Sequence, residues 1–258
     1  LKKYCDKIKI DFLSTPFDLD AVDYLDKLVP FFKIASADIN NYPLIEKICS
    51  KSKPIVLSTG ASNINEIKKT VKFINKKNKN IKLIILHCVL SYPTKNQDAH
   101  LEWINYLQHR FPKNIIGYSD HTLPDYSMMI LTSAFLNGAK VIEKHFSDVK
   151  GKKGNDHFHS LNYKDLIIFR KNIDVLNKIN GDKKKRITLQ CEKKSKLNAR
   201  RSIVTKVSIK KGTKLNKNNL IMKRPGTGIS PEKIYKIIGR SAVRDIKEDI
   251  ILKKSDFK

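Results

Sequence analysis

The run Ile115-Ile116-Gly117-Tyr118-Ser119-Asp120-His121-Thr122 is an apolar strand that ends in polar residues, and Ala-Lys-Val-Ile-Glu-Lys-His-Phe at 139–146 repeats the design. Between them, residues 125–137 carry apolar side chains at helical spacing, and Gly138 follows as a helix-ending residue. The unit is therefore predicted to be β-α-β. Parallel strands joined by a right-handed crossover are commonly neighbours. The pattern therefore predicts that His121 and His145 lie side by side.

These two histidines are the first candidates for a functional site. Side chains alternate across a strand, so Ser119 and His121 share one face, as do Glu143 and His145. Two imidazoles at the carboxyl ends of adjacent strands make half of a metal site, with the other positions open to water or substrate. A single histidine at a strand end is more commonly an ordinary hydrogen-bonded residue. Its recurrence in two consecutive units favours His121 and His145 as metal ligands.

The whole first part of the chain alternates between apolar runs and helical stretches. Asn63 and Glu66 have capping-box spacing ahead of an apolar helical stripe, and a last helix is expected at about 163–178. Buried strands alternating with helices, each strand ending in polar residues, are typical of a TIM (β/α)8 barrel. Six of its eight strands are predicted, at 10–15, 31–35, 54–59, 81–89, 115–119 and 139–145. Two further β-α units, on the order of 60 to 90 residues, are expected ahead of Leu1.

The second part of the chain is predicted to be a separate small domain. Residues 1–180 are assigned to the barrel, the lysine-rich residues 181–197 to a linker, and 198–258 to the small domain. Similar runs at 209–215 and 246–252 are each followed five residues later by an apolar residue, Leu220 and Phe257, which indicates a pseudo-symmetric β-rich module. The basic loop 223–228 lies between the two runs. It is either an ordinary turn or a contact loop.

Composition narrows the class of protein. The 258 residues carry a formal net charge of +27, but the lysines are spread over the chain without a basic patch interleaved with aromatic residues. A general bias towards lysine, together with the binding of anionic substrates, explains this charge better than specific nucleic-acid binding does. No apolar run reaches the ~18 residues of a membrane span, so a cytoplasmic protein is expected. The cysteines have no CxxC spacing and are expected to be reduced thiols: Cys5, Cys49, Cys88 and Cys191.

An ordered set of motifs resembles the N-acetylneuraminate (sialic acid) synthase family over essentially the whole chain. The motifs are FLSTPFD (12–18), KIAS (33–36), NNYPLI (40–45), KPIVLSTG (53–60), HCV (87–89), YPT (92–94), GYSDHT (117–122), EKHF (143–146) and KRPG (223–226). The resemblance implies a barrel followed by an antifreeze-like (SAF) domain. It also implies condensation of phosphoenolpyruvate with the open-chain aldehyde of N-acetylmannosamine or a related 6-deoxy amino sugar, giving a nine-carbon 2-keto acid and phosphate.

The resemblance also implies roles for particular residues. His121 and His145 would hold Mn²⁺ or Mg²⁺, which polarises the aldehyde. The positions implied to bind the phosphate and carboxylate of phosphoenolpyruvate are Thr15, Lys33, Ser36, Ser58 and Ser119. Tyr92 and Asp156 are implied as catalytic residues and Phe17 as a substrate-pocket residue. Arg224 would enter the active site of the other subunit in a domain-swapped homodimer and meet the N-acyl group of the sugar.

Some positions depart from the family pattern. Leu90 stands where several relatives have a small polar residue, and Asp38 where many have glutamate. The glutamate, lysine and glutamine that the first two strands of the family contribute have no counterpart here, so these 258 residues alone are expected not to turn over. The residues of segment 154–157 do not determine which amino sugar is used. His157 and His159 are expected at the surface or the pocket rim, and not as metal ligands.

Two other readings stay open from the sequence. The chain could be an inactive fragment of such an enzyme, or a carbohydrate-binding or partner-binding remnant of one. A nucleic-acid binder, suggested by charge alone, would bind DNA at salt concentrations well above physiological, where simple charge attraction fades.

Overall fold

The computed structural model describes residues 1–149, 154, 156–181 and 185–258, and the chain divides into two compact units. We call Leu1–Gly181 the barrel unit and Asp182–Lys258 the small unit. The barrel unit contains the helices α1 (Lys2–Ile8), α2 (Leu19–Asp26), α3 (Tyr42–Ser50), α4 (Ile64–Lys77), α5 (Glu102–Arg110), α6 (Met129–Leu136) and α7 (Tyr163–Asn180). Its strands are β1 (Phe32–Ile34), β2 (Ile55–Ser58), β3 (Leu83–Cys88), β4 (Ile115–Asp120) and β5 (Ile142–Lys144).

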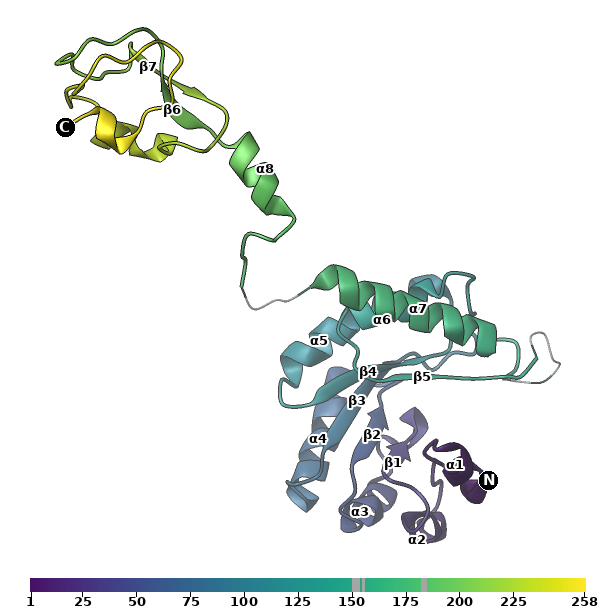
Figure 1. Ribbon diagram of the computed structural model, residues 1–258. Helices are drawn as coiled ribbons and strands as arrows, with labels where there is room; N and C mark the ends of the chain where they lie inside the picture. The colour runs from purple at the N-terminus through teal and green to yellow at the C-terminus, as the bar shows by residue number, and fades with distance from the viewer. Residues whose placement is uncertain (150–153, 155, 182–184) are drawn as a thin grey trace. The chain divides into compact units, whose positions relative to one another are not determined.

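The five strands form one parallel sheet in the order in which they occur along the chain (Figure 1). Helices between the strands pack on the outer face of the sheet and bury a single apolar core with it. Strands in sequential order with helices on one side are the construction of a (β/α)8 barrel. The prediction of an incomplete TIM barrel is therefore confirmed, with five of the strands present.

The strand predicted at residues 10–15 is wrong. No strand lies there, and within the described ranges the segment has no strand neighbour. Ile10 and Leu13 are 61% and 42% exposed, and the Ile10 amide donates to the carbonyl of Cys5 in α1 instead. An apolar run becomes a strand only where a neighbouring strand accepts and donates its backbone hydrogen bonds.

Local sequence signals account for the helices that were predicted. The Asn63 side chain accepts from the amides of Asn65 and Glu66, and the Glu66 carboxylate accepts from the amide of Asn63, which completes the predicted capping box of α4. Capping fixes where the helix begins, so that its apolar stripe faces the core. The expected last helix is also confirmed, as α7.

A close approach of β4 to the chain ahead of β5 positions the site. A Cβ at Gly117 would lie 2.4 Å from the carbonyl oxygen of Val141. Only glycine allows the two strands to run this close, and their register then pairs Ser119 with Glu143. The predicted β-α-β unit with adjacent parallel strands is therefore confirmed.

The small unit has an internal two-fold pattern. Strand β6 (Ser202–Thr205) pairs antiparallel with β7 (Leu220–Lys223), and this Thr205–Leu220 pairing recurs 37 residues later between Ala242 and Phe257. Ile209 and Ile246, also 37 residues apart, exchange both backbone hydrogen bonds. The echo in the sequence thus corresponds to a repeated backbone structure. Ahead of it, helix α8 (Glu192–Ala199) begins inside the segment that was predicted as linker.

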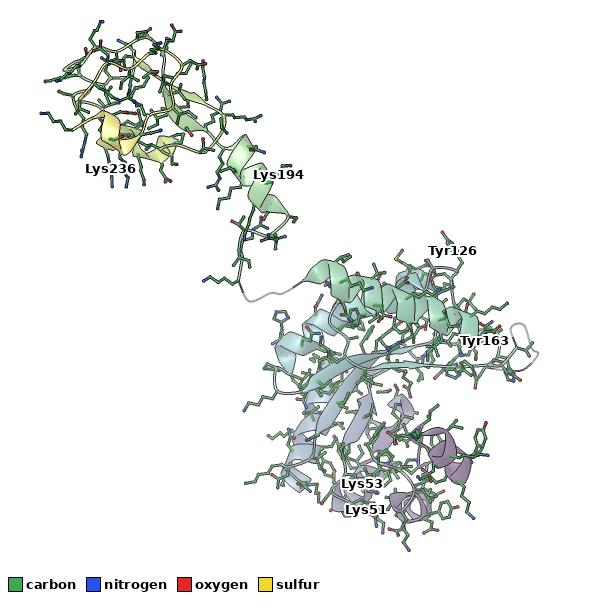
Figure 2. The ribbon with its side chains drawn as sticks, viewed as in Figure 1. Lys51, Lys53, Tyr126, Tyr163, Lys194 and Lys236 are labelled. Carbon is green, nitrogen blue, oxygen red and sulfur yellow. The ribbon has the colours of Figure 1, made fainter. Side chains whose placement is uncertain are left out.

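Many surface lysines lie beside carboxylates. Lys51 lies 2.6 Å from Asp23, and Lys53 lies 3.1 Å from Asp26. Figure 2 labels these two lysines on the barrel unit, and Lys194 and Lys236 on the small unit. Exposed pairs of this kind contribute about 0 to 1 kcal/mol each.

Over the described ranges, no helix combines the length and the apolar composition needed to cross a bilayer.

Because His87 on β3 is buried, we expect the stability of the folded protein to depend on pH. Its Nε2 donates to the carbonyl of Ala99 at 2.7 Å, and burial lowers the pKa of His87 below 6.5. Below pH 6.5 the unfolded chain binds a proton that the folded imidazole does not, so the free energy of unfolding falls as the pH drops towards the lower folded pKa. We expect His87→Gln to reduce the difference in unfolding free energy between pH 7.5 and pH 5, measured in urea by Trp103 fluorescence. An unchanged difference would contradict this assignment.

Candidate active site

A pocket lies at the carboxyl ends of the five strands. Its volume is about 580 Å³, and each strand supplies a residue at or just after its last position. The lining residues are Thr15, Phe17, Lys33, Ala35, Ser36, Ala37, Ser58, Cys88, Leu90, Tyr92, Ser119, Asp120, His121, Glu143, Lys144 and His145. In barrels of this type the site lies at this end because the loops there carry side chains free of the demands of core packing.

The pocket brings together nine of the residues predicted for the site. They are Thr15, Phe17, Lys33, Ser36, Ser58, Tyr92, Ser119, His121 and His145. Asp156 is not in the lining, but its carboxylate is 3.9 Å from Nδ1 of His145. Arg224 belongs to the small unit, where its Nε donates to the carbonyl of Ala199.

The two predicted metal ligands are adjacent. The rings of His121 and His145 have centroids 5.3 Å apart in an edge-on arrangement. Nδ1 of His121 is 2.9 Å from the carbonyl oxygen of Val89, so it is the nitrogen that donates, and Nε2 is left with its lone pair. Nδ1 of His145 lies 3.9 Å from a carboxylate oxygen of Asp156, which is beyond hydrogen-bond distance. An oxygen that fixes one nitrogen of a histidine and frees the other is the usual support for a metal ligand.

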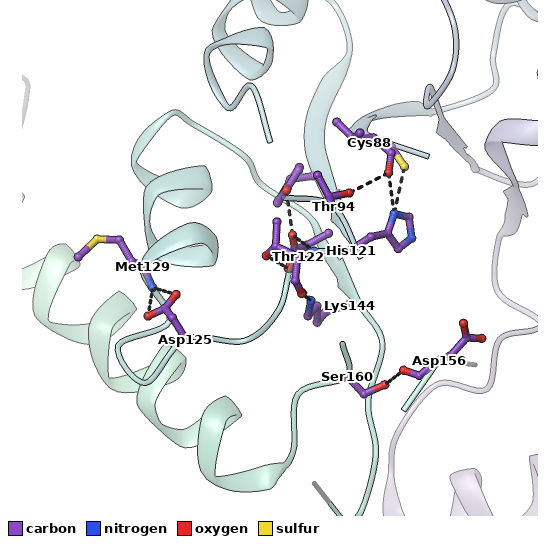
Figure 3. A network of polar contacts seen from close by, with 12 residues as sticks. Cys88, Thr94, His121, Thr122, Asp125, Met129, Lys144, Asp156 and Ser160 are labelled. Atoms are coloured by element: carbon purple, nitrogen blue, oxygen red, sulfur yellow. Dashed lines mark hydrogen bonds and ion pairs between the residues drawn. The ribbon is translucent and has the colours of Figure 1, made fainter. Parts of the chain in front are cut away.

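Burial keeps His121 in the form that a ligand needs. The side chain is 6% exposed, and burial lowers the pKa of its imidazole, with the hydrogen bond to Val89 opposing the shift. Cys88 Sγ lies 3.8 Å from the same Nδ1 (Figure 3), and burial raises the pKa of this thiol. The neutral imidazole of His121 is therefore the form present at neutral pH, beside a protonated thiol.

Lys33, Ser119 and Glu143 form a polar cluster in the pocket. Lys33 Nζ is 3.4 Å from one carboxylate oxygen of Glu143, and the Ser119 hydroxyl donates to the other at 2.6 Å. The Lys33 side chain is 14% exposed. A cation and a hydroxyl that already hold a carboxylate are suited to another anion, such as phosphate.

Ser58 has an unused hydroxyl. It ends β2, is 2% exposed and lines the pocket, and its oxygen has no hydrogen-bond partner within the described part of the chain. A buried hydroxyl without a partner costs about 1–3 kcal/mol. A ligand oxygen in the pocket would provide that partner.

A buried ion pair joins β4 to β5 below the histidines. Lys144 Nζ is 2.7 Å from Asp120, with the two side chains 5% and 2% exposed. Asp120 also accepts from the Tyr118 hydroxyl at 2.8 Å and from the Thr122 amide at 3.0 Å, and Lys144 donates to the Thr122 carbonyl (Figure 3). Burial lowers the pKa of Lys144, and Asp120 opposes this. The network fixes the two strand ends that carry His121 and His145.

His159 is the residue whose placement differs most from expectation. It was expected at the surface or the pocket rim, but it is fully buried, with its ring centroid 4.5 Å from His145 and 6.2 Å from His121. Burial lowers its pKa. His157, in contrast, is half-buried and lies 3.2 Å from the Ser147 hydroxyl. The sequence could not reveal this difference in burial, because both histidines lie in one irregular segment that has neither helical nor strand periodicity.

Other residues of the site were not singled out from the sequence. Glu143 had a signal, since it lies two positions before His145 on the same face of β5. Lys144 and Asp120 gave no sequence signal. They alternate with the residues on the face of His121 and His145, and their pairing depends on the register of β4 against β5.

The donor atoms fit a divalent cation. Ligand atoms of His145, Asp156 and His159 all lie within 4.8 Å of one another, which is a possible metal-binding group. Both ring nitrogens of His159 are buried without a hydrogen-bond partner in the described ranges, as expected of a side chain that has an exogenous partner. Neutral imidazoles and a carboxylate are the donors that divalent transition metals prefer.

Comparison with known proteins agrees with this architecture. Residues 1–185 match the NeuB family model, and residues 200–258 match the SAF domain. The chain is 43% identical over 259 residues to an uncharacterized protein of Methanocaldococcus jannaschii, covering 100% of this chain and 75% of that one. It is 38% identical over 250 residues to the N,N'-diacetyllegionaminic acid synthase of Campylobacter jejuni, covering 96% and 73%.

A solved structure extends the likeness to three dimensions. The N-acetylneuraminic acid (sialic acid) synthetase of Leptospira borgpetersenii superimposes with a TM-score of 0.68 at 33% identity, covering 75% of this chain and 66% of that one. The family model covers more than half of the chain, and the relatives named are matched over about three quarters of their length. The chain therefore belongs to the NeuB, or sialic acid synthase, family and carries a C-terminal SAF domain.

Proposed function

We propose that this protein is a transferase that condenses phosphoenolpyruvate with an N-acetylated amino sugar, giving a nine-carbon 2-keto acid and phosphate. The observation that carries the proposal is a single pocket that holds paired imidazoles beside a lysine and several hydroxyls. The name of the Campylobacter relative, a diacetyllegionaminic acid synthase, supports the same class of reaction. N-acetylmannosamine or a related 6-deoxy sugar is the proposed acceptor, and surface polysaccharide the proposed destination of the product.

The reaction forms one carbon–carbon bond. The methylene carbon of phosphoenolpyruvate attacks the aldehyde carbon of the open-chain sugar, one water is consumed and inorganic phosphate leaves. A divalent cation, Mn²⁺ or Mg²⁺, would supply positive charge at the aldehyde oxygen. His121 would hold it through the nitrogen that Val89 leaves free, and His145 through one of its ring nitrogens.

We assign the anionic end of phosphoenolpyruvate to Lys33 and the serines around it. Ser58 offers a hydroxyl without a partner, while Lys33 and Ser119 would exchange the Glu143 carboxylate for a substrate oxygen. Charge-assisted hydrogen bonds of this type are stronger than neutral ones. Thr15 and Ser36 complete the proposed set.

We assign the sugar to the side of the pocket that carries Tyr92. Its ring is 4.3 Å from His121 and 6.1 Å from His145, so a sugar beside the cation would contact it. Phe17, 68% exposed, offers an apolar surface at the rim. Asp156 is the proposed acidic partner beside His145. The contribution of Arg224 from a partner subunit, the domain-swapped homodimer and the cytoplasmic location stay predictions.

Phosphate release tests the function. The full-length protein is incubated with phosphoenolpyruvate, an N-acetylated hexosamine and Mn²⁺, and inorganic phosphate and the 2-keto acid are measured. We expect release only when both substrates and the cation are present. A protein that binds phosphoenolpyruvate but releases no phosphate with any hexosamine tested would instead be a binding remnant of such an enzyme.

Replacing Lys33 tests the anion site. We expect Lys33→Met to raise the KM for phosphoenolpyruvate by about 10- to 100-fold, because a charge-assisted contact contributes about 1.5–3 kcal/mol. The KM for the amino sugar should change far less. Steady-state kinetics with each substrate varied in turn measure both values.

Lys51→Met is the matched control. It removes the same charge, but Lys51 ends α3, ahead of the amino end of β2 and not at the carboxyl ends of the strands, and it pairs with Asp23. An equal rise in KM for the two variants would show that total charge, and not the pocket, attracts the anion.

A further inference from the structure

His159 is a buried imidazole in need of a partner. Its side chain is 0% exposed, and neither Nδ1 nor Nε2 has a hydrogen-bond partner among the residues that the structure describes. A buried polar atom left in this state destabilises the folded protein. A buried imidazole in this state needs a partner from outside the described residues, and a ligand bound in the site is one that would meet this need.

Backbone contacts hold His159 beside the metal ligands. Leu161, two residues later, donates its amide to the carbonyl of His145 at 2.9 Å and pairs with the chain beyond β5 at Phe146. The Ser160 hydroxyl donates to the carbonyl of Asp156 at 2.6 Å (Figure 3). These bonds fix both sides of His159. The backbone around His159 is therefore held beside that of His145.

The surrounding rings form one cluster. Three histidine rings, those of His121, His145 and His159, lie with centroids between 4.5 and 6.2 Å apart, and Tyr92 is 5.7 Å from His159. Two ligands bound to one cation at roughly 2.0–2.3 Å each cannot be more than about 4.6 Å apart. Ligand atoms of His145 and His159 lie within 4.8 Å of each other, close to this limit, while the ring centroid of His121 is 5.3 Å from that of His145 and 6.2 Å from that of His159.

We propose that His159 is a third imidazole ligand of the cation held by His121 and His145, and that the site therefore selects a divalent transition metal over Mg²⁺. The inference rests on the proposed function only in placing a cation on the first two histidines. Imidazole suits Mn²⁺, Co²⁺ and Zn²⁺ in increasing order of affinity, whereas Mg²⁺ prefers oxygen ligands and retains its waters. A third nitrogen thus strengthens the binding of Co²⁺ and hardly affects that of Mg²⁺.

Metal binding without substrates tests the proposal. Native protein and the variant His159→Phe are titrated calorimetrically with Co²⁺ and with Mg²⁺, and nitrogen couplings to bound Mn²⁺ are counted by pulsed electron paramagnetic resonance. Phenylalanine retains the buried ring but has no nitrogen, so the packing is kept. We expect three imidazole couplings in the native protein and two in the variant. The Kd for Co²⁺ should rise at least about 10-fold, and that for Mg²⁺ less than about 3-fold.

His157→Gln is the matched control. It removes an imidazole two positions away in the same segment, one that faces Ser147 instead. We expect metal binding close to that of the native protein, with thermal unfolding confirming that every variant folds. An equal loss of Co²⁺ affinity in both variants would overturn the proposal, because disturbance of the segment would then explain both.

The remaining outcomes separate this proposal from the one on which it rests. Two couplings in the native protein, with Co²⁺ binding unchanged in His159→Phe, would reject His159 as a ligand and leave the synthase assignment intact. No imidazole coupling at all, with Co²⁺ binding unaffected by His121→Ala, would reject the cation site itself and with it both proposals.

Discussion

The variant His121→Ala is expected to lose at least about 10³-fold in kcat/KM for the condensation. The replacement removes one of the two adjacent imidazoles proposed to hold the cation, and polarisation by a cation is worth several kcal/mol in metal-assisted reactions. Its Kd for Mn²⁺ should rise in parallel. Steady-state kinetics at saturating Mn²⁺, together with calorimetric titration of the metal, measure both effects.

His109→Ala is the control for this prediction. His109 is exposed on α5, where its Nδ1 lies 2.7 Å from the carbonyl of Asn105, and it is not among the pocket residues. Its loss should leave turnover and Mn²⁺ affinity unchanged. Native kinetics in His121→Ala would reject the assignment of the metal to this pair of histidines.

Breaking the buried ion pair is expected to have the largest effect on stability. Asp120→Ala would leave the Lys144 ammonium buried without its carboxylate and the Tyr118 hydroxyl without its acceptor. Removing one member of such a pair costs about 3–5 kcal/mol of unfolding free energy. Urea denaturation followed by Trp103 fluorescence reports it, since this is the one tryptophan of the sequence and lies in the barrel unit.

Two further variants make the measurement decisive. Asp23→Asn breaks exposed pairs with Lys47 and Lys51 and should cost less than about 1 kcal/mol. Adding Lys144→Met to Asp120→Ala should recover part of the loss, because the unpaired charge is then gone. Equal costs for Asp23→Asn and Asp120→Ala would show that the buried pair contributes no more than a surface pair.

The part of the site formed by β4, α6 and β5 could be predicted from the sequence. Apolar runs ending in Ser119 and His121, or in Glu143 and His145, specify two strands and the faces on which those side chains lie. Adjacent pairing then follows from the short crossover between them. These are local patterns combined with one general rule of topology, and both can be read without coordinates.

Features that depend on distant contacts could not be predicted in the same way. Residues 10–15 have the composition of a strand, but hydrogen bonding to a neighbour decides whether one forms. The burial of His159 depends on how the segment after β5 folds back, through the bond from Leu161 to His145. The pairing of Lys144 with Asp120 needs the register of β4 against β5, which neither residue encodes by itself.

The contact of Glu143 with Lys33 and Ser119 has a thermodynamic consequence for substrate capture. A free lysine side chain loses up to about 2 kcal/mol of rotamer entropy when it is immobilised. Here the carboxylate of Glu143 already restricts Lys33 in the folded protein. At the proposed site an incoming anion would therefore replace one partner of Lys33 with another instead of ordering a loose side chain, and its affinity would reflect the difference between two ionic contacts.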